Sequence, residues 1–384
     1  MTITAQSSVF SLAVQSAKNG SASNITVGDL DWYRTRAPRI GIGTIQQQET
    51  FPLETGGPIV PTGSFKSGQY PAGDVEMIPR AEEFLGYLLY GATGACDTAE
   101  DSVYDSEAET LDAATYTGVN SHRFKFAADG YTLPWLATRV RVPGATAGDV
   151  YGEVHQDMKI NSFRLNIPAA GLLGASVGFQ GLKSFYPNAT AVNAWTYENT
   201  TEDSLSAPHS GKGQFLLGGD AYPITGASIE LVNNLSSPQQ EMVVGSYHPD
   251  DAVSISRALQ IRIVYKWENP DFYRQLLTGS TSGTEWDSIP FLQDTADAGA
   301  KAFEGVFQSP GNIPGVTGGD LPFELKVVAN RVVWQIDRGG IELQAGNIIQ
   351  VPYVGTVLEP AAGEEYLEIY LQNAATYDFA GVWS

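Results

Sequence analysis

Apolar and polar residues alternate along many short stretches of the chain, most clearly at residues 157–184. There, Phe163, Leu165 and Ile167 are separated by single polar residues, the pattern of a β-strand with one buried face. Pro168 ends this strand, and a second run follows in which small residues alternate with larger ones, as is typical of a strand lying close to a neighbour. The stretch is therefore predicted to be a β-hairpin.

Further alternating runs predict strands along the whole chain. They lie at residues 40–45, 73–78, 122–126, 136–142, 227–232, 258–267 and 366–371. Two predicted helices interrupt these runs, one bracketed by Pro79 and Gly91 and the other by Pro270 and Gly279. Both have acidic residues in the first turn, where they complement the helix dipole. The chain is thus predicted to be mainly β, with one short helix in each half.

The order of these elements repeats along the chain. The first helix, EEFLGYLLYGATG from Glu82, aligns with PDFYRQLLTGSTSG from Pro270, 188 residues later. The hairpin strand NSFRLNIPAAG at residues 161–171 aligns with NRVVWQIDRGG at residues 330–340, 169 residues later. A repeated order of strands, helix and hairpin indicates a tandem duplication of one β-rich domain.

The stretch 186–214 loses the alternating pattern and collects Asn, Thr, Ser, Gly and Pro, so we place the boundary between the two copies there. We expect two β-sandwich or barrel-like domains, at residues 1–190 and 191–384. Each domain is expected to have one short flanking α-helix, together with extended loops and a terminal arm.

Three stretches are expected to be irregular. Residues 1–28 are mostly small and polar, which favours an arm outside the core. Residues 49–73 are rich in Gly and Pro and predict a long loop of the kind that often binds something. Residues 97–112 carry seven carboxylates and no basic group, which favours a solvated surface loop. A calcium site is the alternative there, although the usual calcium-loop spacing is missing.

Composition excludes several classes of function. The chain has 43 acidic and 22 basic residues and a net charge of −21, so no broad basic surface is available for nucleic acid or anionic membranes. Its single cysteine, Cys96, excludes an intrachain disulfide, and four histidines leave little for a soft metal site. We find no targeting segment and no apolar run long enough to span a membrane, so we expect synthesis in the cytosol.

No catalytic motif is present. The run Gly211-Lys212-Gly213 breaks the phosphate-loop pattern, and no base is placed beside Cys96. A carboxylate pair for sugar hydrolysis cannot be located among so many acids. We therefore predict no enzyme activity and no cofactor. The bulky apolar residues beyond the last strand are expected to dock either on their own domain or on a neighbouring subunit.

Several longer runs resemble a known family. They are SFKSGQYPAGDVEMIPRAEEFLGYLLYGATG from Ser64, HRFKFAADGYTLPWLATRVRV from His122, MKINSFRLNIPAAGLLGASVGFQGLKS from Met158 and ASIELVNNLSSPQQEMVVGSYHPDDAVSISRALQIRIVYKWENPDFYRQLL from Ala227. These runs are similar to the tail tube proteins of long-tailed, non-contractile bacteriophages of the siphovirus type. They cover roughly two-thirds of the chain.

The resemblance implies a structural virion protein whose subunits form rings that stack into a hollow tail tube for ejecting the genome into the host. Family members often carry one tube domain in sixfold rings, so the duplication predicts three chains in a pseudo-sixfold ring. The expected partners are further copies of the chain, other tail proteins at the tube ends, and the tape-measure protein and phage DNA, which pass through without tight binding. No membrane partner is expected, and the protein made in the host cytoplasm ends in the phage tail.

Candidate residues follow from this reading. Candidate contacts between subunits are the aromatic residues Phe51, Phe65, Tyr70, Tyr377, Phe379 and Trp383. Candidate acidic surface or lumen residues are Asp97, Glu100, Asp101, Asp105, Glu107, Glu109 and Asp112, because acids around a lumen would repel phosphates. Contact between rings is expected from a loop at 43–74 or at 287–321. The alternative functions are a carbohydrate- or calcium-binding β-sandwich module, in another virion component or a secreted lectin-like protein, and, less favoured, a glycoside hydrolase.

Overall fold

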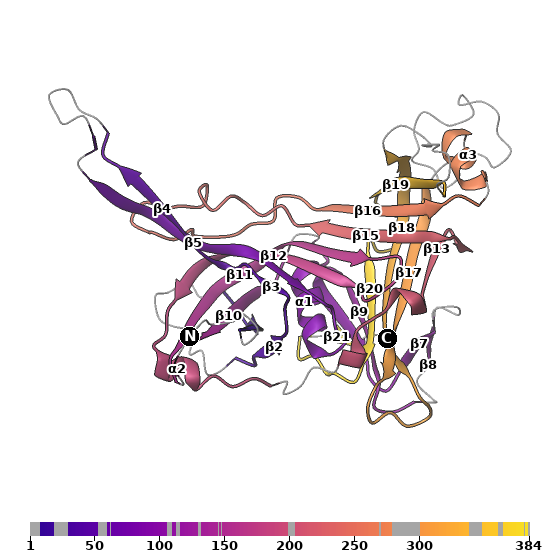
Figure 1. Cartoon of the computed structure of the whole chain (residues 1–384), viewed down its shortest axis with the longest axis horizontal. Helices are drawn as coiled ribbons and strands as arrows, with labels where there is room; N and C mark the ends of the chain where they lie inside the picture. The colour runs from indigo at the N-terminus through magenta and orange to yellow at the C-terminus, as the bar shows by residue number, and fades with distance from the viewer. Residues whose placement is uncertain are drawn as a thin grey trace.

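The computed structural model confirms a mainly β chain with three short α-helices (Figure 1). The residues it describes are 8–18, 30–52, 60–61, 63–105, 110–112, 116–129, 132–144, 146, 148–198, 204–268, 270–278, 300–337, 348–359, 364–379 and 381–382. Pairing between the strands is antiparallel throughout this part of the chain, except between β21 and β6.

The first half contains twelve strands and helices α1 and α2. They are β1 (Val9–Gln15), β2 (Tyr33–Thr35), β3 (Arg39–Ile40), β4 (Gly43–Thr50), β5 (Ser64–Met77), α1 (Glu83–Thr93), β6 (Gly94–Ala99), β7 (Val103–Asp105), β8 (Thr110–Asp112), β9 (Asn120–Phe126), β10 (Trp135–Pro143), β11 (Val150–Ile167), β12 (Gly174–Phe185) and α2 (Ala189–Asn193).

The second half begins with two 3-10 turns and contains helix α3. Its elements are η2 (Ser204–Ser206), η3 (Ser210–Lys212), β13 (Gly213–Leu217), β14 (Asp220–Ala221), β15 (Ile224–Val232), β16 (Ala258–Lys266), α3 (Asp271–Thr278), β17 (Ala300–Asn312), β18 (Pro322–Ile336), β19 (Gln350–Val357), β20 (Glu368–Asn373) and β21 (Gly381–Val382).

Eight strands from both halves form one continuous antiparallel layer. Their order is β4-β5-β12-β11-β15-β16-β19-β18. Every second residue of these strands faces the core, among them the fully buried Val177, Ile261 and Tyr353. The residues between them form a polar face, as the period of two in the sequence predicts. We call this layer the eight-stranded sheet.

A second layer closes the other side of the core. It contains β6, β9, β20, β18 and β17 in that order, and β13 pairs with β17 at its far edge. The long strand β18 belongs to both layers, because its first part pairs with β20 and its last part with β19. On the first half, β2, β1 and β10 continue from the N-terminal part of β11 and complete the wall.

The two halves have the same strand order. In the first half it is β1-β10-β11-β12-β5-β4, and in the second it is β13-β17-β18-β19-β16-β15. The helix offset of 188 residues carries Met77 of β5 onto Tyr265 of β16, and both are buried. Following the ladders inward then matches Phe163 with Ile336, four residues from the hairpin alignment made on sequence alone.

Helix α1 lies inside the core rather than on its flank. Nine of its eleven residues are buried, because β1, β11 and the C-terminal segment surround it. A helix covered on nearly every side must be apolar nearly all round, as EFLGYLLYGAT is. Gly94 ends it in the left-handed conformation with φ 104°, which glycine adopts without a Cβ clash.

Some expected boundaries were wrong. Residues 9–15 of the expected N-terminal arm form the core strand β1, in which Phe10 and Leu12 are fully buried. Residues 64–73 of the expected loop belong to β5, and residues 300–312 of the expected loop 287–321 form β17. In each case cross-strand pairing orders a stretch whose Gly and Pro content had suggested a loop.

Both halves share one hydrophobic core. The pairs β11-β15 and β9-β20 join strands from the two halves, and a single cluster of buried side chains runs through both. The boundary expected at residue 190 falls inside α2. The division into two domains therefore stays a prediction about ancestry and assembly.

Candidate assembly surfaces

Strands β4 and β5 continue past the eight-stranded sheet as a two-stranded arm that projects from the body (Figure 1). We define the arm as residues 43–52 and 63–71. Near its end, Phe51 and Phe65 are 51% and 45% exposed, and their ring centroids lie 5.6 Å apart. Tyr70, closer to the body, is half-buried. An exposed aromatic pair on a projecting hairpin is suited to a partner surface.

The segment 233–257, which connects β15 to β16, runs from the second half over the first half and along the arm (Figure 1). The Gln69 amide donates to the Tyr247 carbonyl at 2.7 Å, and the Lys159 ammonium donates to the Ala252 carbonyl at 2.6 Å. Gly68 leaves room for Met242, whose Cε would lie 2.7 Å from a Cβ at that position. We call this segment the crossing loop. It fixes the base of the arm to the second half.

The C-terminal segment docks on the same chain. Tyr377 is 4% exposed and its ring packs edge-on against Tyr87 of helix α1, with centroids 5.4 Å apart. Phe379 stacks on Tyr90 of the same helix at 4.1 Å. A role for Tyr377 and Phe379 between subunits stays a prediction. Trp383 lies outside the described residues.

A chain of neutral hydrogen bonds holds this segment in place. Thr98 Oγ1 and Nδ1 of His122 are 2.8 Å apart, and His122 Nε2 is 3.0 Å from Asn373 Oδ1. Asn373 Nδ2 donates to the Tyr377 hydroxyl, which donates to the Glu83 carbonyl at 3.1 Å. Burial lowers the pKa of His122 to about 4, only partly opposed by its hydrogen bonds, so the ring stays neutral at pH 7.

The acidic run is not one solvated loop. Asp97 lies in β6, Asp105 in β7 and Asp112 in β8, so cross-strand pairing orders most of the stretch. Glu100 is exposed, and the carboxylate of Asp101 accepts the amide of Gly118 at 2.7 Å. Glu107 and Glu109 lie outside the described residues. Within the described residues no group of three or more His, Cys, Asp or Glu side chains could hold a metal ion.

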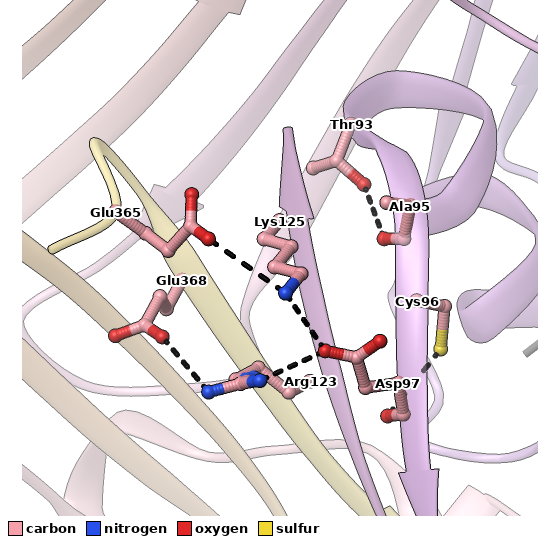
Figure 2. A network of polar contacts seen from close by, with 8 residues as sticks. All are labelled: Thr93, Ala95, Cys96, Asp97, Arg123, Lys125, Glu365 and Glu368. Atoms are coloured by element: carbon pink, nitrogen blue, oxygen red, sulfur yellow. Dashed lines mark hydrogen bonds and ion pairs between the residues drawn. The ribbon is translucent and has the colours of Figure 1, made fainter. Parts of the chain in front are cut away.

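Asp97 instead belongs to an ionic network that joins the two halves (Figure 2). Arg123 and Lys125 of β9 donate to its Oδ2 at 2.8 and 2.9 Å. From the second half, Glu368 lies 3.7 Å from Arg123 and Glu365 lies 3.7 Å from Lys125. Burial alone would raise the pKa of Asp97, but its bonds to the two cations outweigh burial and hold the pKa below its usual value.

The polar face of the eight-stranded sheet is nearly balanced in charge. Its charged residues include Asp74, Glu76 and Glu230, together with Arg164 and Arg262. Arg164 stands directly across from Glu230 in the β11-β15 ladder. Serine, glycine and amide residues fill most of the positions between them. The described residues of the acidic run belong to β6 and to the separate hairpin β7-β8, not to this face.

Sequence reasoning missed a clasp on the outside of the first half. Arg139 of β10 is 3% exposed, and its guanidinium lies 3.7 Å from the ring centroid of Trp32 and 4.9 Å from that of Trp195. Burial lowers the pKa of Arg139 to about 10. The clasp ties the segment after α2 to the first half. Only its aromatic residues were visible in the sequence, since the three parts lie far apart along the chain.

The thiol of Cys96 is buried, and burial raises its pKa to about 12. The neutral His122 is engaged with Thr98 and Asn373, so neither group is placed to activate the other. In the described part of the chain, no helix has the length and apolar character needed to cross a membrane.

A search of curated proteins found no match to the chain. A family described as phage tail tube protein matches residues 61–324, from the end of the arm through β18. The match covers more than half of the chain and contains most of the eight-stranded sheet, the crossing loop and helix α1. The chain therefore belongs to the phage tail tube protein family, and it is a structural component of a multi-subunit tail tube in the virion.

Proposed function

We propose that the chain carries two tandem tube domains and that three chains close into a pseudo-sixfold ring of a non-contractile, siphovirus-type tail tube. Stacked rings form the channel through which the genome leaves, and the eight-stranded sheet turns its polar face to that channel. The tape-measure protein and the DNA pass through the same lumen.

The observation that carries this proposal is the pairing between β15 and β11. Strand β15 is the edge strand of the second half, and it pairs with β11 of the first half from Ala227 opposite Ile167 to Val232 opposite Ser162. Its counterpart in the first half is β4, which pairs only with β5 among the described strands. A β4 edge left without a second partner is the natural continuation of the same contact in another copy.

The receiving strand for that contact is β18, the counterpart of β11. Within the described residues, Gln335 and Ile336 pair only with β19. Applying the β15-β11 register to the matched strands places Ile45 of one chain opposite Gln335 of the next. Three chains with eight strands each would then close a ring of 24 strands with no free edge.

The polar face supports a passage role through weak interactions. Arginines there have carboxylates within the same face, so a passing phosphate meets no uncompensated basic patch. This replaces the expectation that the acidic run lines the lumen. Under the proposal, the repulsion of DNA comes from balanced and uncharged side chains and from the excess negative charge of the chain as a whole.

Native mass spectrometry and negative-stain microscopy of the purified protein test the proposal. We expect a three-chain species and rings with a central hole that stack into tubes. A chain that stays monomeric at high concentration, or rings of six chains, would contradict it. A second test replaces Ile45 and Gln335 by cysteine in one chain, because the proposed register predicts a covalent species of three chains under mild oxidation.

A further inference from the structure

The inference starts from the wedge between β5 and β12. These strands pair only from Ala72 to Met77, and beyond that point β5 runs into the arm while β12 stays with β11. The crossing loop fills the opening. It bonds to Gln69 on one side, and Gln180 of β12 donates to the Ser236 carbonyl at 2.7 Å on the other.

The second half has the matching wedge, between β16 and β19. The helix offset carries Gln69 onto Arg257, and the β16-β19 ladder then carries Gln180 onto Thr356. Here the wedge holds a pocket of about 690 Å³. Its walls include Arg257 and Leu259 from the β16 side and Val357 from β19. The pocket therefore occupies the place that the crossing loop fills in the first half.

The remaining walls suit an aromatic side chain. Phe126 at the end of β9 and Tyr366 before β20 lie in the pocket with their ring centroids 6.1 Å apart, and the guanidinium of Arg257 lies 4.5 Å from the Phe126 centroid. Lys125 and Glu365 line the same pocket. An apolar floor with charges of both signs at its rim is typical of a specific protein contact.

The segment that matches the crossing loop is the end of the arm. Both connect the edge strand of a half to the next strand of the eight-stranded sheet. In Figure 1 the arm points away from the first half in the direction in which the crossing loop leaves the second half. The crossing loop has a receiving surface within the chain, whereas Phe51 and Phe65 at the end of the arm remain exposed.

We propose that the arm of one chain inserts Phe51 and Phe65 into the β16-β19 pocket of the adjacent chain in the same ring. The occupant is thus a second copy of this chain. Charges agree with this, because Glu49 and Lys66 flank the aromatic pair and the pocket offers Arg257 and Glu365. The inference rests on the proposed three-chain ring, and it makes the arm a lateral contact rather than one between stacked rings.

Cross-linking tests this contact. The double variant with Phe65→Cys and Ala128→Cys places one thiol on the arm and one on an exposed residue of the pocket wall. The native Cys96 is buried and does not compete. A short bis-maleimide should give covalent species of two and three chains and stop there. The matched control combines Phe65→Cys with Ala191→Cys on the exposed face of α2, and it should give none.

The outcomes separate this inference from the proposed ring. Three-chain rings without the arm-to-pocket cross-link would overturn the lateral contact and leave the ring standing. A ladder running past three chains would place the arm in the next ring and also overturn it. Filling the pocket by Ala128→Trp should lower the yield of rings at least tenfold, whereas Ala191→Trp should not. Equal yields from both variants would count against the pocket as receptor.

Discussion

The contact between helix α1 and the C-terminal segment depends on one missing methyl group. A Cβ at Gly86 would lie 2.1 Å from the hydroxyl oxygen of Tyr377 and 2.2 Å from its Cζ. The ring cannot move aside locally, because it stacks on Phe379 at 5.1 Å and packs against His122 at 4.6 Å. The substitution Gly86→Ala should therefore displace the C-terminal segment from α1.

The magnitude follows from opposing effects. Losing the packing of a buried aromatic side chain costs about 3–5 kcal/mol. Replacing glycine by alanine inside a helix stabilises it by about 1 kcal/mol. Gly86→Ala should therefore lower the free energy of unfolding by about 2–4 kcal/mol. In a chain that already carries Tyr377→Ala no clash remains, and the same substitution should raise the free energy of unfolding by about 1 kcal/mol.

Urea unfolding of the unassembled full chain, followed by tryptophan fluorescence, measures all four members of this double-mutant cycle. The sign of the Gly86→Ala effect should reverse between the wild-type and Tyr377→Ala backgrounds. Equal destabilisation in both backgrounds would refute the reasoning, because the clash would then involve something other than the Tyr377 ring. The Tyr377→Phe variant is a milder control, since it removes only the hydroxyl and should cost about 1 kcal/mol.

Three further predictions concern buried polar groups. His122 and His155 are both held neutral by burial, with pKa values of about 4 against 6.5 in the unfolded chain, so their stability is complete above pH 6.5 and is lost toward pH 4. Unfolding midpoints should fall between pH 7 and pH 5 by about 3 kcal/mol at most for each histidine, and a flat profile would contradict this. Replacing Asp97→Asn should cost about 2 kcal/mol in urea unfolding, because two half-buried cations lose their shared partner; no loss would show the network to be neutral. Arg139→Met should cost about 1–2 kcal/mol and speed proteolysis after α2 if the guanidinium holds the clasp, and unchanged cleavage there would argue against it.

Strand patterns in the sequence predicted most of the eight-stranded sheet. Phe163, Leu165 and Ile167 face the core as the alternation indicated, and Arg164 faces away. The repeat was also visible, since both helices and both hairpins align at the level of residues. These features were predictable because the side-chain period of a strand and the cap of a helix are local properties.

The errors fell where a neighbour far along the chain determines the structure. Residues 9–15 looked like part of an arm, but β10 pairs with them along their full length. Residues 64–71 looked like a loop, but β4 pairs with them and makes them an arm. Neither partner is close in sequence, so neither pairing leaves a local signal.

The sequence by itself determined a β-rich chain, its repeated order of elements, its family resemblance and its lack of any recognisable catalytic motif. Only the tertiary structure decided that the two halves share one core, that Asp97 is neutralised by Arg123 and Lys125, and that Tyr377 packs inside the chain. It also placed an exposed arm at one end and an open pocket in the matching wedge of the other half. The reason is physical: period and propensity act between neighbours in sequence, whereas burial, ion pairing and the shape of a pocket depend on residues brought together from distant parts of the chain.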